Sequence, residues 1–160
     1  VEAARYLTDD YVVLIGGTGE LHDELQSLIR RWHVTDRVQL LGRVSDHDLP
    51  AYYGMCDLFC LSSVQKTEAF GIVQIEAMSC GKPIVATRIP QSGVSWVNID
   101  GESGLNVEPC DARALAHAIM TVCSDDALYQ RLSNGARERF DKIFTYDRMI
   151  DNTLTIYNQL

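Results

Sequence analysis

Short apolar runs alternate with amphipathic stretches along most of the chain. Each of five such runs has the length of a strand and is followed by a glycine or a polar residue. Continuous apolar runs of this kind are typical of strands covered on both faces of a parallel sheet. The pattern predicts strands at residues 11–15, 38–41, 57–61, 83–86 and 105–107.

The stretches between these runs carry apolar residues at helical spacing. The clearest has Leu21, Leu25 and Leu28 on one face, and Asp111 has the position of an N-cap for a later helix. Alternating strands and helices predict an α/β fold with a doubly wound, mostly parallel sheet covered on both sides. The helices are expected near residues 1–7, 21–32, 49–53, 72–81, 112–123, 128–140 and 146–160.

Four loops follow predicted strands: 16–19, 42–45, 62–71 and 87–93. Because ligands of open parallel sheets bind at the carboxyl ends of the strands, we expect these loops to share one functional rim.

The stretch from Glu68 to Glu76 is the most informative part of this rim. Its second carboxylate lies in a predicted helix with hardly another polar side chain, and burying a carboxylate is costly unless it is hydrogen-bonded or paired. Gly71 stands where the loop turns into the helix, and helix N-termini present unpaired N–H groups to anions. One acid before the helix and one inside it could hold the two polyhydroxylated ends of a phosphate-linked ligand, as in a nucleotide-sugar.

Each of these residues also has a purely structural interpretation. Glu68 could be a solvated loop acid, and Glu76 could pair with an internal Arg or Lys. The three glycines of segment 16–19 do not complete a dinucleotide fingerprint and fit any close turn. Arg43 could be a surface residue or could stack its guanidinium on a nucleobase.

Composition restricts the class of protein further. The chain of 160 residues has the length of one domain, and its net charge of −8 argues against a nucleic-acid-binding surface. The five cysteines are odd in number, and we interpret them as buried free thiols of a reducing compartment rather than zinc ligands or disulfides. The four histidines have neither metal-ligand spacing nor a partner nucleophile. Residues 1–7 read as the end of a helix without a preceding strand, so we expect a fragment of a larger protein.

The motifs together resemble the C-terminal half of GT-B-fold retaining glycosyltransferases of family 4, also called glycosyl transferases group 1. The resemblance runs nearly from end to end, and the two acids eight residues apart, with Phe70-Gly71 between them, are its signature. Other matching segments are 16–19, 36–46, 53–63, 76–86, 100–107 and 111–119. Segment 87–98 departs from the Gly-Gly-x-x-Glu pattern that is frequent in the family. In this segment the chain is similar to the family members that build bacterial surface polysaccharides.

The resemblance implies a Rossmann-like domain, one half of a GT-B fold, and a role for each matching residue. Glu68 would hold hydroxyls of the transferred sugar and is the candidate catalytic residue. Glu76 would accept hydrogen bonds from the ribose, with Arg43 and Val44 framing the base. The sugar and the distal phosphate would face Gly17 and the backbone amides of Phe70, Gly71 and Ile72.

The resemblance also implies how such an enzyme works. It would transfer with retention, without a bound metal or other cofactor, and would stabilise the leaving diphosphate with positive groups. The Arg and Lys that hold the diphosphate lie upstream of residue 1, as does the N-terminal domain that holds the acceptor. Residues 1–160 would thus be the C-terminal nucleotide-sugar-binding domain, inactive alone.

We therefore predict a hexosyltransferase that uses a UDP- or GDP-sugar and a lipid-linked or saccharide acceptor in polysaccharide or lipopolysaccharide synthesis. It would lie in the cytoplasm or, through peripheral association of the full enzyme, at the inner face of the cytoplasmic membrane. The alternatives are a non-catalytic nucleotide-sugar-binding module and a GT-B-like epimerase, whose acidic and histidine set is not evident. A receiver domain is rejected because Asp57 begins a predicted strand instead of ending one.

Overall fold

The computed structural model describes residues 1–159. All five predicted strands are present, each within one or two residues of its expected bounds. They are β1 (Val13–Gly16), β2 (Val38–Gly42), β3 (Phe59–Leu61), β4 (Ile84–Thr87) and β5 (Gly104–Val107).

Helices connect the strands, as the apolar spacing predicts. Gly81 has a positive φ of 68° just after α3, which is the left-handed position that commonly ends a helix. The helical elements are η1 (Glu2–Tyr6), α1 (His22–Arg31), α2 (Leu49–Met55), α3 (Ile72–Ser79), α4 (Val94–Val97), α5 (Ala112–Ser124), α6 (Asp126–Arg139), η2 (Phe140–Phe144) and α7 (Tyr146–Tyr157).

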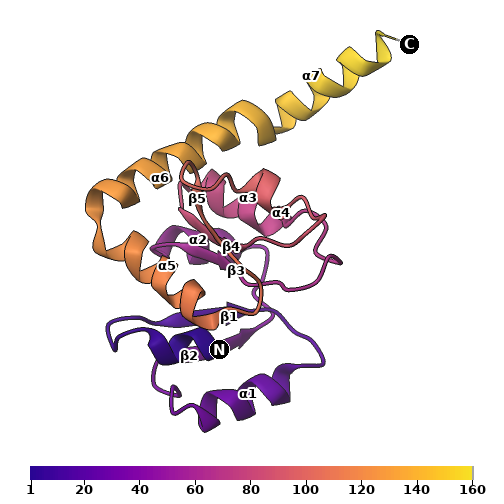
Figure 1. Cartoon of the computed structure of the whole chain (residues 1–160). Helices are drawn as coiled ribbons and strands as arrows, with labels where there is room; N and C mark the ends of the chain where they lie inside the picture. Colours follow the sequence, from indigo (N-terminus) through magenta and orange to yellow (C-terminus); the bar gives the residue numbers. More distant parts are fainter. Residues whose placement is uncertain (160) are drawn as a thin grey trace.

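The strands form two separate parallel sheets in the described part of the chain, one with order β1-β2 and the other with order β3-β4-β5. Every pair is parallel, so the expected α/β class is confirmed. The expected single sheet is not formed among these residues, since no ladder of hydrogen bonds joins β1 to β3. Figure 1 shows β1 and β2 below the three-stranded sheet.

Helices cover both faces of the three-stranded sheet. Ile84 and Ala86 of β4 pack in a cluster with residues of α2, α3 and α4, whereas Val85 points to the other face and packs with α5 and α6. The smaller sheet shares a core with η1 and α1, in which Ala4, Ile29 and others are buried. Contacts between α5 and η1 connect the two parts, as Figure 1 also shows.

Several predictions about single elements are corrected. The opening segment is a short 3₁₀ helix instead of the end of an α-helix, and α4 was not expected at all. The cysteines are free, as predicted, but they are not buried: Cys60, Cys80 and Cys110 are exposed and the other two are half-buried. The predicted C-terminal helix is observed as α7, and its expected last residue, Leu160, lies outside the described residues.

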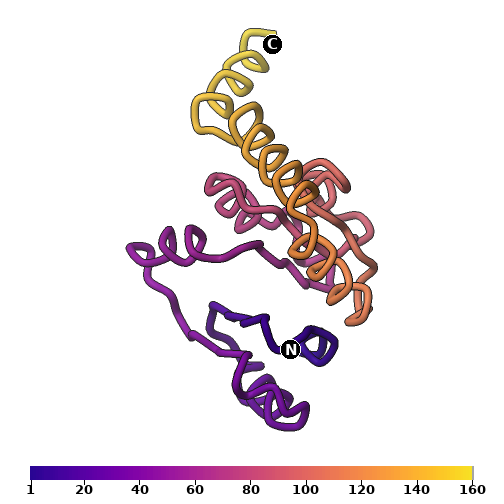
Figure 2. The backbone as a smooth tube through the Cα atoms, turned by 90° about the vertical axis from the view of Figure 1, so that its left-hand side faces the viewer, coloured from indigo at the N-terminus to yellow at the C-terminus, as the bar shows by residue number. Residues whose placement is uncertain are grey.

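The C-terminal helix α7 projects away from the body of the domain (Figures 1 and 2). It follows a five-residue π-helix, η2, and none of its residues is buried. Within residues 1–159, no helix is long and apolar enough to cross a membrane.

Candidate functional site

The loop after β3 and the first turns of α3 bring together all the residues predicted between Glu68 and Glu76. Gly71 is the N-cap of α3 and has φ +75°, and no side chain caps the helix. A Cβ at Gly71 would lie 2.7 Å from Leu61 Cδ2 and 2.7 Å from Gln74 Nε2. The positive φ favours glycine at this turn, and of the N–H groups in the first turn of α3, that of Gln74 donates to the Gly71 carbonyl oxygen at 2.9 Å. We call residues 62–72 together with Glu76 the acid rim.

Glu68 lies in this loop and is held mainly through its backbone. The Ser92 hydroxyl donates to the Glu68 carbonyl oxygen at 2.5 Å. The Ser63 hydroxyl approaches one carboxylate oxygen, Oε2, at a long 3.4 Å. The side chain is half-buried, and none of the ion pairs found among residues 1–159 includes it. The carboxylate therefore keeps most of its capacity to accept hydrogen bonds from a ligand.

Glu76 stands one helical turn after Ile72 and is also half-buried. Its partner is a tyrosine: the Tyr53 hydroxyl of α2 donates to Glu76 Oε2 at 2.8 Å. Burial, followed by the contact with Glu76, raises the pKa of Tyr53 far above its ordinary value, so the phenol stays protonated and donates. The alternative of an internal Arg or Lys partner is not observed in the part of the chain described here.

Phe70 and Ile72 flank the turn, and their side chains are 37% and 66% exposed. Their predicted contribution comes from the backbone, and the uncapped start of α3 fits that role. Because each amide near a helix N-terminus adds to a local positive potential, this turn is suited to a phosphate or another anion.

The other predicted residues lie at the ends of β1 and β2. Gly17 has φ +131°, and its N–H donates to the Gly42 carbonyl oxygen at 2.7 Å. Val44 lies close to Gly16, because a Cβ on Gly16 would be 3.5 Å from Val44 Cγ2. Arg43 stands between these residues on the surface and is exposed. We call residues 16–21 and 42–44 the glycine rim.

An open groove of about 460 Å³ includes much of the glycine rim. Its walls are residues 15–22, Leu25 and Leu40, so Gly17 lies in it beside the start of α1. No hydrogen bond or ion pair in the described chain joins Arg43 or Val44 to Glu76. The predicted site residues thus form two groups, one at the end of each sheet, and a nucleoside would have to span both to contact Arg43, Val44 and Glu76.

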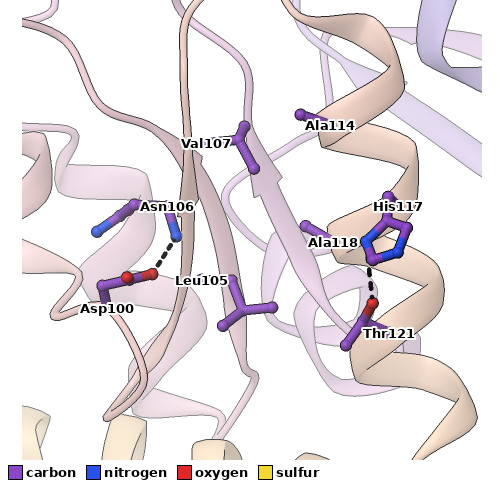
Figure 3. Close-up of a pocket in the computed structure, with 8 residues that line it drawn as sticks. All are labelled: Asp100, Leu105, Asn106, Val107, Ala114, His117, Ala118 and Thr121. Carbon is purple, nitrogen blue, oxygen red and sulfur yellow. Dashed lines mark hydrogen bonds between the residues drawn. The ribbon is translucent and has the colours of Figure 1, made fainter.

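A second open groove, of about 550 Å³, lies between β5 and α5 (Figure 3) and contains none of the predicted site residues. Its polar groups are paired with one another: the Asn106 N–H donates to Asp100 Oδ1 at 2.7 Å, and His117 Nδ1 lies 3.3 Å from the Thr121 hydroxyl. We therefore assign it no role in the candidate site.

Sequence reasoning missed three residues that hold the acid rim: Tyr53, Gln74 and Ser92. Gln74 is fully buried in α3, and its Nε2 donates to the Phe70 carbonyl oxygen at 3.3 Å. A glutamine in an otherwise apolar helix was the available signal for it. Nothing in the sequence marks Tyr53 or Ser92, because their partners lie 23 and 24 residues away.

Known proteins are similar to this chain in sequence. The family model described as glycosyl transferases group 1 matches residues 1–139. The O-antigen chain mannosyltransferase C of Escherichia coli is 30% identical over 149 residues, which are 93% of this chain and 39% of that protein. The D-inositol 3-phosphate glycosyltransferase of Salinispora tropica is 32% identical over 158 residues, 96% of this chain and 32% of that protein.

Solved structures agree with these relatives. HepE of Anabaena, crystallised in complex with UDP, has a TM-score of 0.89 and 26% identity, covering 99% of this chain and 44% of that one. A complex of the same protein with UDP-glucose gives a TM-score of 0.88. The chain spans less than half the length of the relatives that it matches. Because the family model covers most of its residues, this chain belongs to the glycosyl transferases group 1 family.

Proposed function

We propose that the chain is the donor-binding part of a retaining glycosyltransferase that moves a hexose from a UDP- or GDP-sugar to a lipid-linked or saccharide acceptor. The observation that carries the proposal is the acid rim. In it, the start of α3, which has Gly71 as its N-cap and no capping side chain, lies between the half-buried carboxylates of Glu68 and Glu76. Each carboxylate can accept further hydrogen bonds from a ligand.

The start of α3 supports the negative part of the donor. The amides of Phe70, Gly71 and Ile72 face the sugar and the distal phosphate in this proposal. As the bond to the sugar breaks, negative charge grows on the leaving diphosphate, and fixed N–H dipoles stabilise it without reorganising. Further positive groups come from outside residues 1–160, as the family resemblance implies.

The two carboxylates orient the neutral ends of the donor. Glu68 accepts hydrogen bonds from hydroxyls of the hexose, beside the bond that breaks. Glu76 accepts hydrogen bonds from the ribose through Oε1, while the Tyr53 hydroxyl holds Oε2. Arg43 and Val44 of the glycine rim frame the base, and Gly17 lies toward the phosphate. Each residue keeps the role that the family signature gives it.

The comparisons support the donor class and the process. HepE, which is similar to this chain, was crystallised with UDP and with UDP-glucose. Relatives include the mannosyltransferase of O-antigen chains and a lipopolysaccharide core biosynthesis glycosyltransferase of Rhizobium meliloti, 32% identical over 156 residues. We place the full enzyme in surface polysaccharide or lipopolysaccharide synthesis, in the cytoplasm or at the inner face of the cytoplasmic membrane.

We also propose that the full protein adds an acceptor domain and one parallel strand between β1 and β3. The support is the burial of β1: its residues Val13, Leu14 and Ile15 are as apolar as those of β4, yet they are only half-buried. A strand that leads into η1 and then β1 by a right-handed crossover would lie beside β1. In hydrogen exchange, the amides of β1 should then be more protected in the full-length protein than in residues 1–160.

Transfer assays on the full-length protein test the function. Incubation with UDP- and GDP-hexoses and extracted lipid-linked or saccharide acceptors should give a product whose anomeric configuration, read by NMR, matches that of the donor. Excess EDTA should leave the rate unchanged, because we propose that no divalent metal takes part. A protein that binds no nucleotide-sugar would contradict the proposal, and one that binds without transfer would be a non-catalytic module.

A further inference from the structure

Trp96 is an exposed aromatic side chain beside the acid rim. It lies in α4, whose residues Val94 and Val97 are fully buried, whereas Trp96 is 52% exposed. Its ring centroid is 5.8 Å from that of Phe70, with the ring planes tilted by 35°. Phe144, from η2, meets the Trp96 ring edge-on at 5.6 Å. Such aromatic contacts stabilise a packed pair beyond the area that they bury.

Arg139, the last residue of α6, completes this cluster. Its Cζ lies 5.4 Å from the Trp96 ring centroid and 5.5 Å from that of Phe144. Its Nε donates to the Val97 carbonyl oxygen at 2.8 Å, and its Nη2 donates to the Trp96 carbonyl oxygen. Burial lowers the pKa of Arg139, yet a guanidinium stays charged in proteins, so its charge is directed at α4 and the rings.

Backbone contacts connect α4 to the loop that carries Glu68. The Gly93 N–H donates to the Ala69 carbonyl oxygen at 2.7 Å. The two segments approach so closely that a Cβ on Gly93 would lie 2.9 Å from that oxygen and 3.0 Å from Phe70 Cδ2. The loop and α4 are therefore in direct backbone contact.

The buried side chain of Gln74 is a second connection between this loop and α4. The amide nitrogen of Gln74 lies 3.3 Å from the Phe70 carbonyl oxygen and 3.5 Å from that of Val94. Two groups therefore fix the turn at Phe70. The buried amide of Gln74 binds its carbonyl oxygen, and the half-exposed Trp96 ring packs against its side chain.

We propose that Trp96 is a positioning residue for transfer. Its ring packs against Phe70 and is itself supported by Phe144 and Arg139, and this contact fixes the position of Glu68 and of the first amides of α3. The inference rests on the proposed function of the acid rim. Its physical reason is that residues 62–71 contain no helix or strand, so their geometry depends on what packs against them. Displacement of a reacting group by about 1 Å can lower a rate 100-fold.

Two of the supporting groups come from the C-terminal part of the chain. Phe144 and Arg139 lie 74 and 69 residues after Phe70, in the segment that leads into α7. The position of this segment is therefore linked to the geometry of Glu68 through the rings of the cluster.

The test measures kcat and the nucleotide Kd separately in the full-length protein. Trp96→Ala should lower kcat about tenfold and change the Kd of UDP or GDP less than about twofold, since the Glu76 contact stays in place. Trp96→Phe should restore most of kcat because it keeps an aromatic ring on Phe70. Tyr157→Ala, which removes an exposed aromatic side chain from α7, serves as the matched control and should leave kcat unchanged.

Phe144→Leu should lower kcat like Trp96→Ala, and the double variant should lose little more, because both changes remove the same support. A lower Tm with unchanged kcat in Trp96→Ala would assign Trp96 a structural role and overturn the inference. If the wild type binds nucleotide in the same titrations, the proposed function stands, and the result then concerns the role of Trp96 alone.

Fluorescence provides a readout that needs no change at Trp96. The chain has two tryptophans, so Trp32→Phe leaves Trp96 as the only one in residues 1–160, and each further tryptophan of the full-length protein is replaced as well. Saturating donor sugar should shift the emission of Trp96 more than the nucleotide alone does. Emission that stays constant while calorimetry reports donor binding would contradict a link between Trp96 and the Phe70 turn.

Discussion

The acid rim and the glycine rim carry the two halves of one predicted site, but they are built differently. The acid rim rests on the three-stranded sheet, where every residue of β4 is buried and Gly71 is wedged between Leu61 and Gln74. The glycine rim rests on two strands, and residues 16–21 and Arg43 are all exposed. The geometry of the acid rim is thus set within this chain, whereas among residues 1–159 no strand pairs with the second edge of β1, next to the glycine rim.

The largest effect is expected at Gly71, which fixes the acid rim. In the full-length protein, Gly71→Val places a β-branched side chain at a positive φ and against atoms 2.7 Å away. Donor affinity should fall by at least about 100-fold in calorimetric titration, since displacing the amides at the start of α3 removes at least two hydrogen bonds to a charged group, each worth about 1.5–3 kcal/mol. Gly54→Ala is the matched control, because a Cβ there meets nothing within 4 Å, and it should bind normally. Equal affinity in both variants would contradict the assigned turn.

Glu76→Ala should have the next largest effect, on nucleotide affinity. Loss of the hydrogen bonds from the ribose to a charged acceptor costs about 1.5–3 kcal/mol, which raises the Kd of the free nucleotide roughly 10- to 150-fold. Tyr53→Phe removes only the hydroxyl that holds Oε2 and should raise the Kd a few-fold at most. If the nucleotide Kd is unchanged in Glu76→Ala, the ribose contact is absent.

Glu68→Ala should act on the chemical step. Its carboxylate contacts the hexose, so kcat should fall by a factor that corresponds to about 1.5–3 kcal/mol. The Kd of the nucleotide without the sugar should stay within about twofold of the wild type, because no contact with the nucleoside is lost. A variant with wild-type kcat would exclude Glu68 from the site.

The smallest effect is expected in the glycine rim. Arg43→Ala removes one exposed guanidinium from the base, and stacking of this kind contributes about 1–3 kcal/mol in favourable cases and less in solvent. We expect the nucleotide Kd to rise two- to fivefold, on the order of the weak end of that range. Arg30→Ala, an exposed arginine at the far end of α1, is the control. A loss as large as that of Glu76→Ala would reverse the ranking of the two rims.

The sequence predicts what local patterns determine. The apolar runs locate all five strands, and the glycine at 71 correctly marks the turn into α3. Burial is harder to predict: β1 and β4 have equally apolar residues, but among residues 1–159 β4 lies between two strands and β1 pairs with one. The residues of a strand do not show whether a neighbouring strand pairs with it, so burial cannot be predicted from them alone.

Partners distant in sequence could not be predicted either. Glu76 was expected to need a partner, and the local pattern offered Arg or Lys as the alternative to a ligand. The structure supplies the Tyr53 hydroxyl from another helix, which satisfies one oxygen and leaves the other. Likewise, α4 has only four residues, too few for a helical period to be recognised in the sequence.

Saturation-transfer NMR of a donor sugar on the full-length protein tests whether Glu68 and Glu76 contact opposite ends of the donor. With wild type, both the ribose and the hexose protons should receive saturation. Glu76→Ala should lose the ribose signals first and Glu68→Ala the hexose signals, since one acid meets each end of the donor. Equal loss of both sets in both variants, or saturation confined to the base, would contradict the account.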